Sequence, residues 1–317
     1  MVLHQTYKNQ VQLLLDVLPE VAKETCFALH GGTAINLFVR NMPRLSVDID
    51  LTYIPIEGRQ TSITSINTAL STIKAQIERI KPLCQISHNA DTCKLLISEQ
   101  SAQIKIEVNT VSRGVIAGVQ KHLLCHRAQE MFDAFCSVQM VSIGQLFGGK
   151  ICAALDRQHP RDLFDIKLML ENEGLTDEIK QGFIYALLSS VRPMHEIFDP
   201  NLLDQRQLFE THFDGMTGIS FTYDDFETTR LDLLKRMNAV LSREDREFIL
   251  GVNRLAPDWS RYPFGDFASV RWKLRNLENL KTQDVAKYEA QCQKLISIMS
   301  NDDKGLQSKA AFDQKRP

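Results

Sequence analysis

Two glycines and a threonine lie shortly before a strand that carries two aspartates, and this arrangement constrains the fold more than any other feature. Gly31, Gly32 and Thr33 open a stretch with helical character, and Asp48 and Asp50 follow in an apolar strand pattern. A helix start offers unpaired N–H groups to an anion, and glycine lets the anion approach the backbone. Alternate residues of a strand share a face, so both aspartates point the same way. The pattern predicts a phosphate cradle beside a divalent-metal site.

Each half of this pattern has a simpler interpretation on its own. An Asp-x-Asp pair often marks the solvated face of a strand, and a Gly-Gly pair often supplies no more than a turn with positive φ. Their occurrence together, with apolar residues alternating through the strand, favours metal and phosphate binding. Two neighbouring residues each have two possible roles. Ser46 either caps locally or hydrogen-bonds a phosphate, and Arg44 is either a surface charge or a phosphate ligand.

A second block begins after Ser142, which is typical of a helix N-cap. Apolar residues follow at helical period, and Lys150, Ala154 and Arg157 fall on one face at i, i+4 and i+7. We predict that Lys150 and Arg157 hold nucleotide phosphates and that Ala154 leaves room between them. The glycines of this segment also resemble the start of a P-loop. Ile151 stands where that motif needs a magnesium-binding Ser or Thr, so we reject a P-loop.

Pro160 is predicted to start the next helix, which carries three charged residues close together. Arg161 and Asp165 are spaced i, i+4, and Asp162 and Asp165 are spaced i, i+3. One interpretation is a salt-bridged helix surface that locks two helices together. In the other, Asp165 is functional and either orients Lys150 or assists proton removal from an acceptor.

The two blocks together resemble the AbiEii/AbiGii toxin group of nucleotidyltransferases, within the DNA polymerase β-like superfamily. The resemblance covers roughly residues 25–170 and rests on Gly31-Gly32-Thr33, Arg44-x-Ser46-x-Asp48-x-Asp50, Lys150, Ala154, Arg157 and Arg161-Asp162-x-x-Asp165. It implies transfer of a nucleotidyl group from a nucleoside triphosphate (NTP) to a hydroxyl, with release of pyrophosphate.

The resemblance also assigns roles to individual residues. It implies catalytic roles for Asp48, Asp50, Lys150 and Asp165, binding of Mg²⁺ or Mn²⁺ by Asp48 and Asp50, and nucleotide binding by Gly31, Gly32, Thr33, Arg44, Ser46 and Arg157. In the two-metal arrangement for in-line displacement, a third carboxylate on a neighbouring strand helps to neutralise the ions. Glu107 is the acidic residue of the strand predicted at 103–109 and is the candidate for this third ligand. The alternative is a glutamate on the sheet face that pairs with Lys105.

Members of this group act as toxins of toxin–antitoxin or phage-defence pairs, and some modify the 3′ end of tRNA. The resemblance therefore implies a tRNA or other RNA acceptor and a cognate antitoxin as partners. Two alternatives stay open. One is an enzyme of the same fold that nucleotidylates a protein or a small molecule such as an aminoglycoside. The other is a catalytically silent nucleotide-binding regulator, although retention of Asp48, Asp50 and Lys150 argues against it.

Hydrophobic periodicity predicts an α/β (α+β) fold, with a small mixed sheet flanked by helices and a mainly helical C-terminal part, and the resemblance implies that this is the nucleotidyltransferase fold. The expected helices lie at 7–24, where Pro19 interrupts the pattern, and at 62–80, and the expected strands lie at 46–54, 84–88, 93–98 and 103–109. The expected organisation is a nucleotidyltransferase domain at 1–172, a helical domain at 173–300 and a flexible tail at 301–317.

Composition and charge fit a cytoplasmic enzyme. The 37 Lys and Arg residues against 39 Asp and Glu give a net charge of −2, so any RNA contact needs a local basic patch. The seven cysteines are odd in number and form no C-x-x-C motif, which favours reduced thiols. No signal sequence and no apolar stretch of about 18 residues is evident, so we expect neither secretion nor membrane insertion.

Two further patterns carry weaker signals. His122 and His126 have the i, i+4 spacing that binds zinc on a helix, but no third ligand follows, so we expect solvated or packed histidines. The segment Arg271–Arg275 joins basic residues to Trp272 and could contact RNA by phosphate pairing and base stacking. The competing interpretation is that Trp272 and Leu274 pack under a charged helix face.

Overall fold

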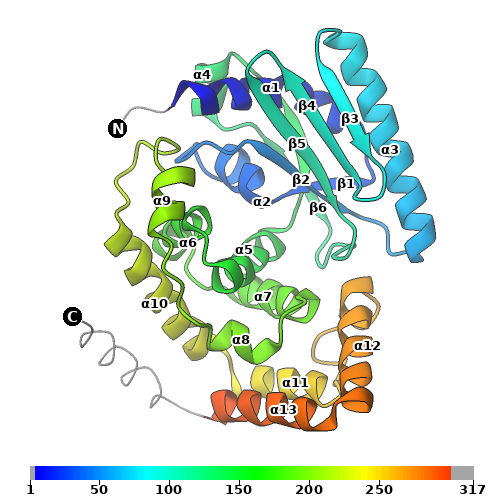
Figure 1. Cartoon of the computed structure of the whole chain (residues 1–317), viewed down its shortest axis with the longest axis vertical. Coiled ribbons are helices and arrows are strands. Elements are labelled where there is room, and N and C mark those ends of the chain that lie inside the picture. Colours follow the sequence, from blue (N-terminus) through cyan, green and yellow to red (C-terminus); the bar gives the residue numbers. More distant parts are fainter. Residues whose placement is uncertain (1–3, 301–317) are drawn as a thin grey trace.

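The computed structural model describes residues 4–300, in which a mixed seven-stranded sheet is followed by a large group of helices (Figure 1). The strands are β1 (Phe27–His30), β2 (Asp48–Tyr53), β3 (Gln85–Asn89), β4 (Lys94–Glu99), β5 (Ala102–Asn109), β6 (Val119–Leu123) and β7 (Ser137–Val141). This confirms the predicted fold class. The sequence analysis did not predict β1, β6 and β7.

Strand β2 lies at the centre of the sheet, whose order is β3-β4-β5-β2-β1-β7-β6. It runs parallel to β5 and antiparallel to β1. Asp50 lies directly opposite Glu107 on β5 and opposite His30 on β1. Directly opposed residues of neighbouring strands share a face of the sheet. The register therefore places three polar side chains from three strands in one row.

Helices pack against this sheet, and within the described residues every element after β7 is a helix. They are α1 (Gln5–Val21), α2 (Gly31–Thr33), the π-helix η1 (Ala34–Val39), α3 (Arg59–Ile80), α4 (His126–Phe132), α5 (Ile143–Arg157), α6 (Pro160–Asn172), α7 (Asp177–Ser189), α8 (Met194–Phe198), α9 (Arg206–His212), α10 (Tyr223–Val240), α11 (Arg243–Asn253), α12 (Ala268–Gln283) and α13 (Val285–Ser300). Ser142 caps α5 as predicted, because its hydroxyl accepts a hydrogen bond from the Gln145 N–H. The predicted interruption at Pro19 is wrong. Pro19 lies in the last turn of α1, and the helix continues through it to Val21.

Helices α1 and α3 pack against each other and against strands β3, β4 and β5. On α3, Ile66, Ile73 and Ile77 are fully buried, as the predicted apolar period requires. The buried residues of β5 alternate with Lys105 and Glu107, which are half-buried on the other face. One face of the sheet is thus closed by helices, and the polar row of residues lies on the other.

Glycines of α5 bring this helix into backbone contact with α7. A β-carbon at Gly148 would lie 2.1 Å from the carbonyl carbon of Gly182, and one at Gly182 would lie 1.8 Å from the carbonyl oxygen of Gly144. We call Gly144, Gly148 and Gly182 the glycine seam. The glycines that resembled a P-loop therefore lie inside a helix, as predicted, and Gly144 and Gly148 serve helix packing.

Between residues 177 and 300 all regular elements are helices, and helices α11–α13 lie at the end of the molecule away from the sheet (Figure 1). This confirms the mainly helical C-terminal part. The boundary proposed near residue 172 stays a prediction, and the glycine seam joins the segments on its two sides. Within residues 4–300, no helix combines the length and the apolar character that a membrane crossing needs. The tail predicted at 301–317 lies outside the described residues.

The structure also tests the predictions for the histidine pair, the cysteines and the segment around Trp272. His122 lies on β6 and His126 begins α4, so the two histidines do not share a helix face. The seven cysteines are all free thiols. On α12, Trp272 is 45% exposed, so the expected packing of Trp272 is wrong. Leu274 packs against the core as expected. Lys273 is buried and donates a hydrogen bond to the Ser190 carbonyl, so it does not join a basic surface with Trp272.

Candidate active site

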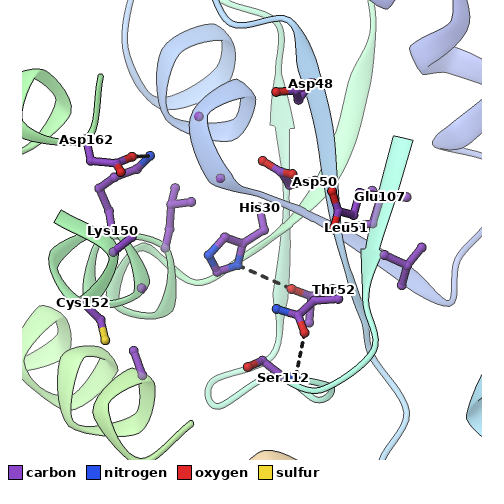
Figure 2. Close-up of a pocket in the computed structure, with 18 of the residues that line it drawn as sticks. His30, Asp48, Asp50, Leu51, Thr52, Glu107, Ser112, Lys150, Cys152 and Asp162 are labelled. Carbon is purple, nitrogen blue, oxygen red and sulfur yellow. Dashed lines mark hydrogen bonds and ion pairs between the residues drawn. The ribbon is translucent and has the colours of Figure 1, made fainter. Parts of the chain in front are cut away.

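Asp48 and Asp50 lie next to each other on β2 and line a cavity of about 840 Å³ (Figure 2). Between and after them, Ile49 and Leu51 are 0% and 3% exposed, so the strand alternates as predicted. The cavity volume is within the range of small-molecule sites, roughly 300–1,000 Å³. Both aspartates are therefore brought together where a ligand of nucleotide size fits.

Gly31 and Gly32 form part of the same cavity wall. Gly31 has φ +74°, and a β-carbon there would lie 2.3 Å from Oδ2 of Asp50. A β-carbon at Gly32 would lie 2.9 Å from both Nη2 of Arg44 and Oγ of Ser46. Glycine is thus needed at both positions because polar side chains lie directly against the backbone.

Thr33 does not line the cavity, contrary to its predicted contact with phosphate. It is fully buried, and its hydroxyl bonds to the Ser46 hydroxyl, 3.0 Å away, and to the Asp48 carbonyl. These bonds tie the start of the helix to the start of β2. Thr33 therefore fixes the distance between the glycine turn and the aspartate strand, and Ser46 and Arg44 line the cavity beside it.

The two aspartates fit a hard divalent cation. Burial and the neighbouring charge of Asp48 raise the pKa of Asp50 to about 6, so bringing a cation to this pair relieves an unfavourable negative charge. Residues 4–300 contain no group of three or more His, Cys, Asp or Glu side chains placed to hold a metal ion. Mg²⁺ is commonly bound through one or two carboxylates, with substrate phosphates and water as further ligands. The donor set present here matches that chemistry.

Glu107 lies in the row beside Asp50, but its carboxylate is already paired. It lies 2.9 Å from Nζ of Lys94 and 2.8 Å from Nζ of Lys105. Burial acts to raise the pKa of Glu107, and the two lysines lower it further than burial raises it. The structure thus combines both interpretations of Glu107: it lines the cavity next to the aspartates, and it pairs with Lys105. Its role as a metal ligand stays a prediction.

Three cations of the cavity are held by two buried carboxylates. Lys150 lies 3.0 Å from Asp162 and 3.2 Å from Asp165 (Figure 2 shows the pair with Asp162). Arg44 donates to both oxygens of Asp165, at 2.8 and 2.7 Å, and Arg157 donates to Asp162 at 2.6 Å. The two acids thus fix three positive groups at one side of the cavity before any ligand arrives.

This network partly decides between the two interpretations of the charged residues on α6, a salt-bridged surface or a functional Asp165. Asp162 and Asp165 are 1% exposed, so they do not form a salt-bridged helix surface, although Asp162 does lock α6 to α5. Burial would raise their pKa values, but Lys150 and the arginines lower both below the ordinary range. Asp165 does not line the cavity, a position that suits orienting Lys150 and Arg44. Ala154 is fully buried, and Ala153 lines the cavity in its place.

The sequence analysis missed His30, which lies between Lys150 and β2 (Figure 2). Its Nδ1 is 3.4 Å from the hydroxyl oxygen of Thr52, and a β-carbon at Gly149 would lie 3.0 Å from its Nε2. Burial, followed by the nearby charge of Lys150, lowers the pKa of His30 to about 4. His30 is therefore neutral near pH 7. Its position directly before Gly31 was the available signal, but β1 itself was not predicted.

Arg161 also lines the cavity, and the sequence analysis gave it no place in the site. Its predicted spacing to Asp165 does not produce an ion pair, because Asp165 faces Arg44 and Lys150. Within residues 4–300 the Arg161 guanidinium forms no ion pair, unlike the three cations above. Burial and the charge of Arg44 lower its pKa. The site thus holds one cation whose charge is not matched by a contacting carboxylate.

Comparisons with known proteins agree with this geometry. A family model described as "Nucleotidyl transferase AbiEii toxin, Type IV TA system" matches residues 12–276. Among solved structures, the nucleotidyltransferase toxin MenT4 from Mycobacterium tuberculosis H37Rv superposes with a TM-score of 0.59 at 11% identity, over 86% of this chain and 95% of that one. An H. pylori protein provisionally classed as a nucleotidyltransferase gives a TM-score of 0.41 at 15% identity, over 76% of this chain and 100% of that one. A sequence search of curated proteins finds no match.

The match to MenT4 shows a shared fold, and the family model spans most of the chain, including both motif blocks. The glycine turn, the aspartate strand and the cations of α5 and α6 meet at one cavity within that span. The chain therefore belongs to the AbiEii nucleotidyltransferase toxin family of type IV toxin–antitoxin systems.

Proposed function

We propose that the protein transfers a nucleotidyl group from an NTP to the 3′-terminal hydroxyl of tRNA, with Mg²⁺ bound by Asp48 and Asp50. The observation that carries the proposal is the shared cavity, which is lined by these carboxylates, Gly31, Gly32 and Lys150, with Asp50 directly against Gly31. Figure 2 shows Lys150 across from Asp50. The modification would block translation, and a cognate antitoxin would relieve it. Such a pair could serve in phage defence.

The chain's own residues account for the handling of the triphosphate. The acceptor hydroxyl gives up its proton to solvent as its oxygen bonds to the α-phosphorus, the bond from that phosphorus to the bridging oxygen of the β-phosphate breaks, and pyrophosphate leaves with the electron pair. Bound Mg²⁺ would activate the acceptor hydroxyl and screen the phosphates. Lys150 and Arg44, held by Asp165, stabilise the charge that develops on pyrophosphate. Gly32 allows the phosphates to approach Arg44 and Ser46 closely.

In-line displacement requires the acceptor to approach from the side opposite the leaving group. Arg44, Lys150 and Arg157 define the pyrophosphate side of the cavity, and Lys94 and Lys105 lie on the β4–β5 side. Both lysines are about one-third exposed, at 37% and 36%. Because Glu107 pairs with both lysines, the three groups carry one positive charge in excess, which supports contact with a phosphate of an RNA acceptor.

The direct test incubates purified protein with each labelled NTP and Mg²⁺, together with tRNA, a protein extract or an aminoglycoside. We expect label at the 3′ end of tRNA with the wild type and none with Asp50→Asn. Asp224→Asn serves as control because Asp224 is exposed on α10 and outside the cavity. Label on protein or drug alone would overturn the tRNA assignment. NTP binding without transfer to any acceptor would overturn catalysis and favour a regulator.

A growth assay tests the biological part of the proposal. Induced expression of the wild type should arrest growth, and Asp50→Ala should abolish the arrest at equal protein level. Equal toxicity of both forms would show that the toxicity does not come from this cavity.

A further inference from the structure

The cavity continues beyond the carboxylates into a space between α5 and α7. We call this space the α5–α7 lobe, and its wall includes Cys152, Ala153, Asp156, Tyr185, Ala186, Ser189 and Ser190. Figure 2 shows Cys152 on α5 past Lys150, on the side away from Asp48. The lobe belongs to the same continuous cavity as the aspartates and the glycine turn.

The chemistry of the lobe differs from that of the phosphate side. Cys152 and Tyr185 are buried, and Ala153 and Ala186 are small and half-buried. Asp156 is paired with Arg192. Aromatic ligands bind in spaces with apolar walls and a few placed polar groups. The α5–α7 lobe has this character, whereas the phosphate side is lined by Arg44, Lys150, Arg157 and Arg161.

The triphosphate, the acceptor and the base of the nucleotide can be assigned to different parts of the cavity by exclusion. Phosphates are drawn to the cations, and the β4–β5 side with Lys94 and Lys105 lies opposite them and is left for the acceptor. Ala153 is three residues from Lys150 on α5, or about 4.5 Å along the helix. A nucleotide held by Lys150 therefore has its non-phosphate end within reach of the α5–α7 lobe.

We propose that this lobe is the nucleobase subsite of the enzyme, with Ala153 and Ala186 against the ring and Ser189 at its edge. The proposal rests on the proposed use of an NTP. Ser189 Oγ lies 2.9 Å from Ser269 Oγ, and either hydroxyl can donate in that pair, so Ser189 can present a donor or an acceptor to the base. The glycine seam fixes α5 against α7 at backbone distance, so the width of the lobe is set by rigid elements.

The test compares two ligands that differ in the presence of a nucleoside. Ala153→Leu should raise the Kd of the Mg²⁺ complex of each NTP about tenfold or more, because added side-chain volume competes with the base. It should leave the Kd of Mg²⁺–tripolyphosphate within about twofold, because the phosphate side is unchanged. Ala75→Leu, at an exposed alanine of α3, is the matched control and should change neither value. Titration calorimetry without acceptor measures both constants.

Two other results of this comparison count against the subsite. Equal weakening of both ligands would mean that Ala153 acts on phosphate binding, and no change in either would place the base elsewhere. If the variants change the two Kd values as expected but the wild-type protein labels no acceptor, the proposed function is overturned and the subsite stands.

A second measurement does not depend on the folding of a variant. Irradiation of wild-type protein with 8-azido-ATP or 4-thio-UTP should attach the base to peptides of α5 or α7, identified by mass spectrometry. Excess unlabelled NTP should prevent the attachment. Protected crosslinks confined to the β3–β4 hairpin or to α12 would overturn the assignment. Ser189→Ala should change the ranking of the four NTPs by Kd, and an unchanged ranking would remove Ser189 from base selection.

Discussion

Gly31 lies directly against the carboxylate of Asp50, so a β-carbon at Gly31 would be 2.3 Å from Oδ2. We predict that Gly31→Ala lowers nucleotidyl transfer at least about 100-fold, because displacement of an active-site group by about 1 Å has effects of that size. Gly118→Ala is the matched control. Gly118 also has φ +74° but has no atom within 4 Å of its β-carbon position. Both variants carry the same backbone strain, so equal activity of the two would refute the contact.

The pairing of Asp162 and Asp165 predicts a dependence of stability on acid. Their folded-state pKa values lie below the unfolded value of about 3.9. The stability that they contribute is therefore complete above about pH 4 and is lost as the pH falls through the folded-state values. Asp162→Asn should lower the free energy of unfolding at pH 7 by about 3 kcal/mol, because Lys150 and Arg157 lose a buried partner.

Urea unfolding at several pH values measures this effect. The difference between wild type and Asp162→Asn should shrink below pH 4, since the unfolded wild-type carboxylate then binds a proton while the folded one stays ionised, which favours unfolding of the wild type. A difference that stays constant down to pH 2 would show that the charge of Asp162 is not responsible.

We predict that Arg161 contributes to ligand binding and does not contribute to the free energy of unfolding. Because its guanidinium has no ion pair in the described chain and lies near Arg44, Arg161→Met should leave the free energy of unfolding unchanged or raise it. The same change should raise the KM for NTP about tenfold, the effect of roughly 1.4 kcal/mol. Thermal unfolding and steady-state kinetics separate the two outcomes. A large loss of stability with an unchanged KM would make Arg161 a structural residue.

The glycine seam predicts a strong effect of a single methyl group. Gly182→Ala places a β-carbon 1.8 Å from the Gly144 carbonyl oxygen, so α5 and α7 must separate. We expect a loss of at least about 3 kcal/mol in the free energy of unfolding, at the upper end of overpacking effects. Gly218→Ala has open space and should change stability by less than about 0.5 kcal/mol. Comparable stability of the two variants would mean that the helices are not in backbone contact.

Metal removal provides a further check. Transfer should stop when a chelator is added and resume with excess Mg²⁺ or Mn²⁺. Asp50→Asn should weaken Mn²⁺ binding, followed by electron paramagnetic resonance, more than Glu107→Gln does, because Glu107 is already neutralised by Lys94 and Lys105. Chelator-resistant transfer would show that the aspartates act without a metal.

Local periodicity was sufficient for the part of the site that lies on regular elements. The two-residue period of β2 placed Asp48 and Asp50 on one face, and the N-cap Ser142 and Pro160 marked the starts of α5 and α6. Motif spacing also brought Lys150 and Arg157 to the cavity correctly. These features depend on residues close together in the sequence, where side-chain direction follows from the backbone period.

Features set by long-range packing were not predictable in the same way. The i, i+4 spacing suggested contact between Arg161 and Asp165, but Asp165 pairs with Arg44, which is 121 residues away in sequence. Thr33 was assigned to phosphate because of its motif, yet its hydroxyl serves the strand. Gly182 gave no signal of its own, since its role depends on which helix crosses it. Which partner a side chain contacts thus depends on the tertiary structure and not on local sequence spacing.

The close crossing of α5 and α7 has a consequence for shortened forms of this protein. A fragment ending near residue 172 would retain every motif residue of the proposed chemistry, including Lys150 and Asp165. It would also leave a strip of α5 main chain open to water at Gly144 and Gly148, and it would lack Tyr185, Ala186 and Ser189 from the cavity wall. Possession of the motifs is thus not the same as possession of an active toxin, and truncated genes of this kind are expected to encode inert proteins.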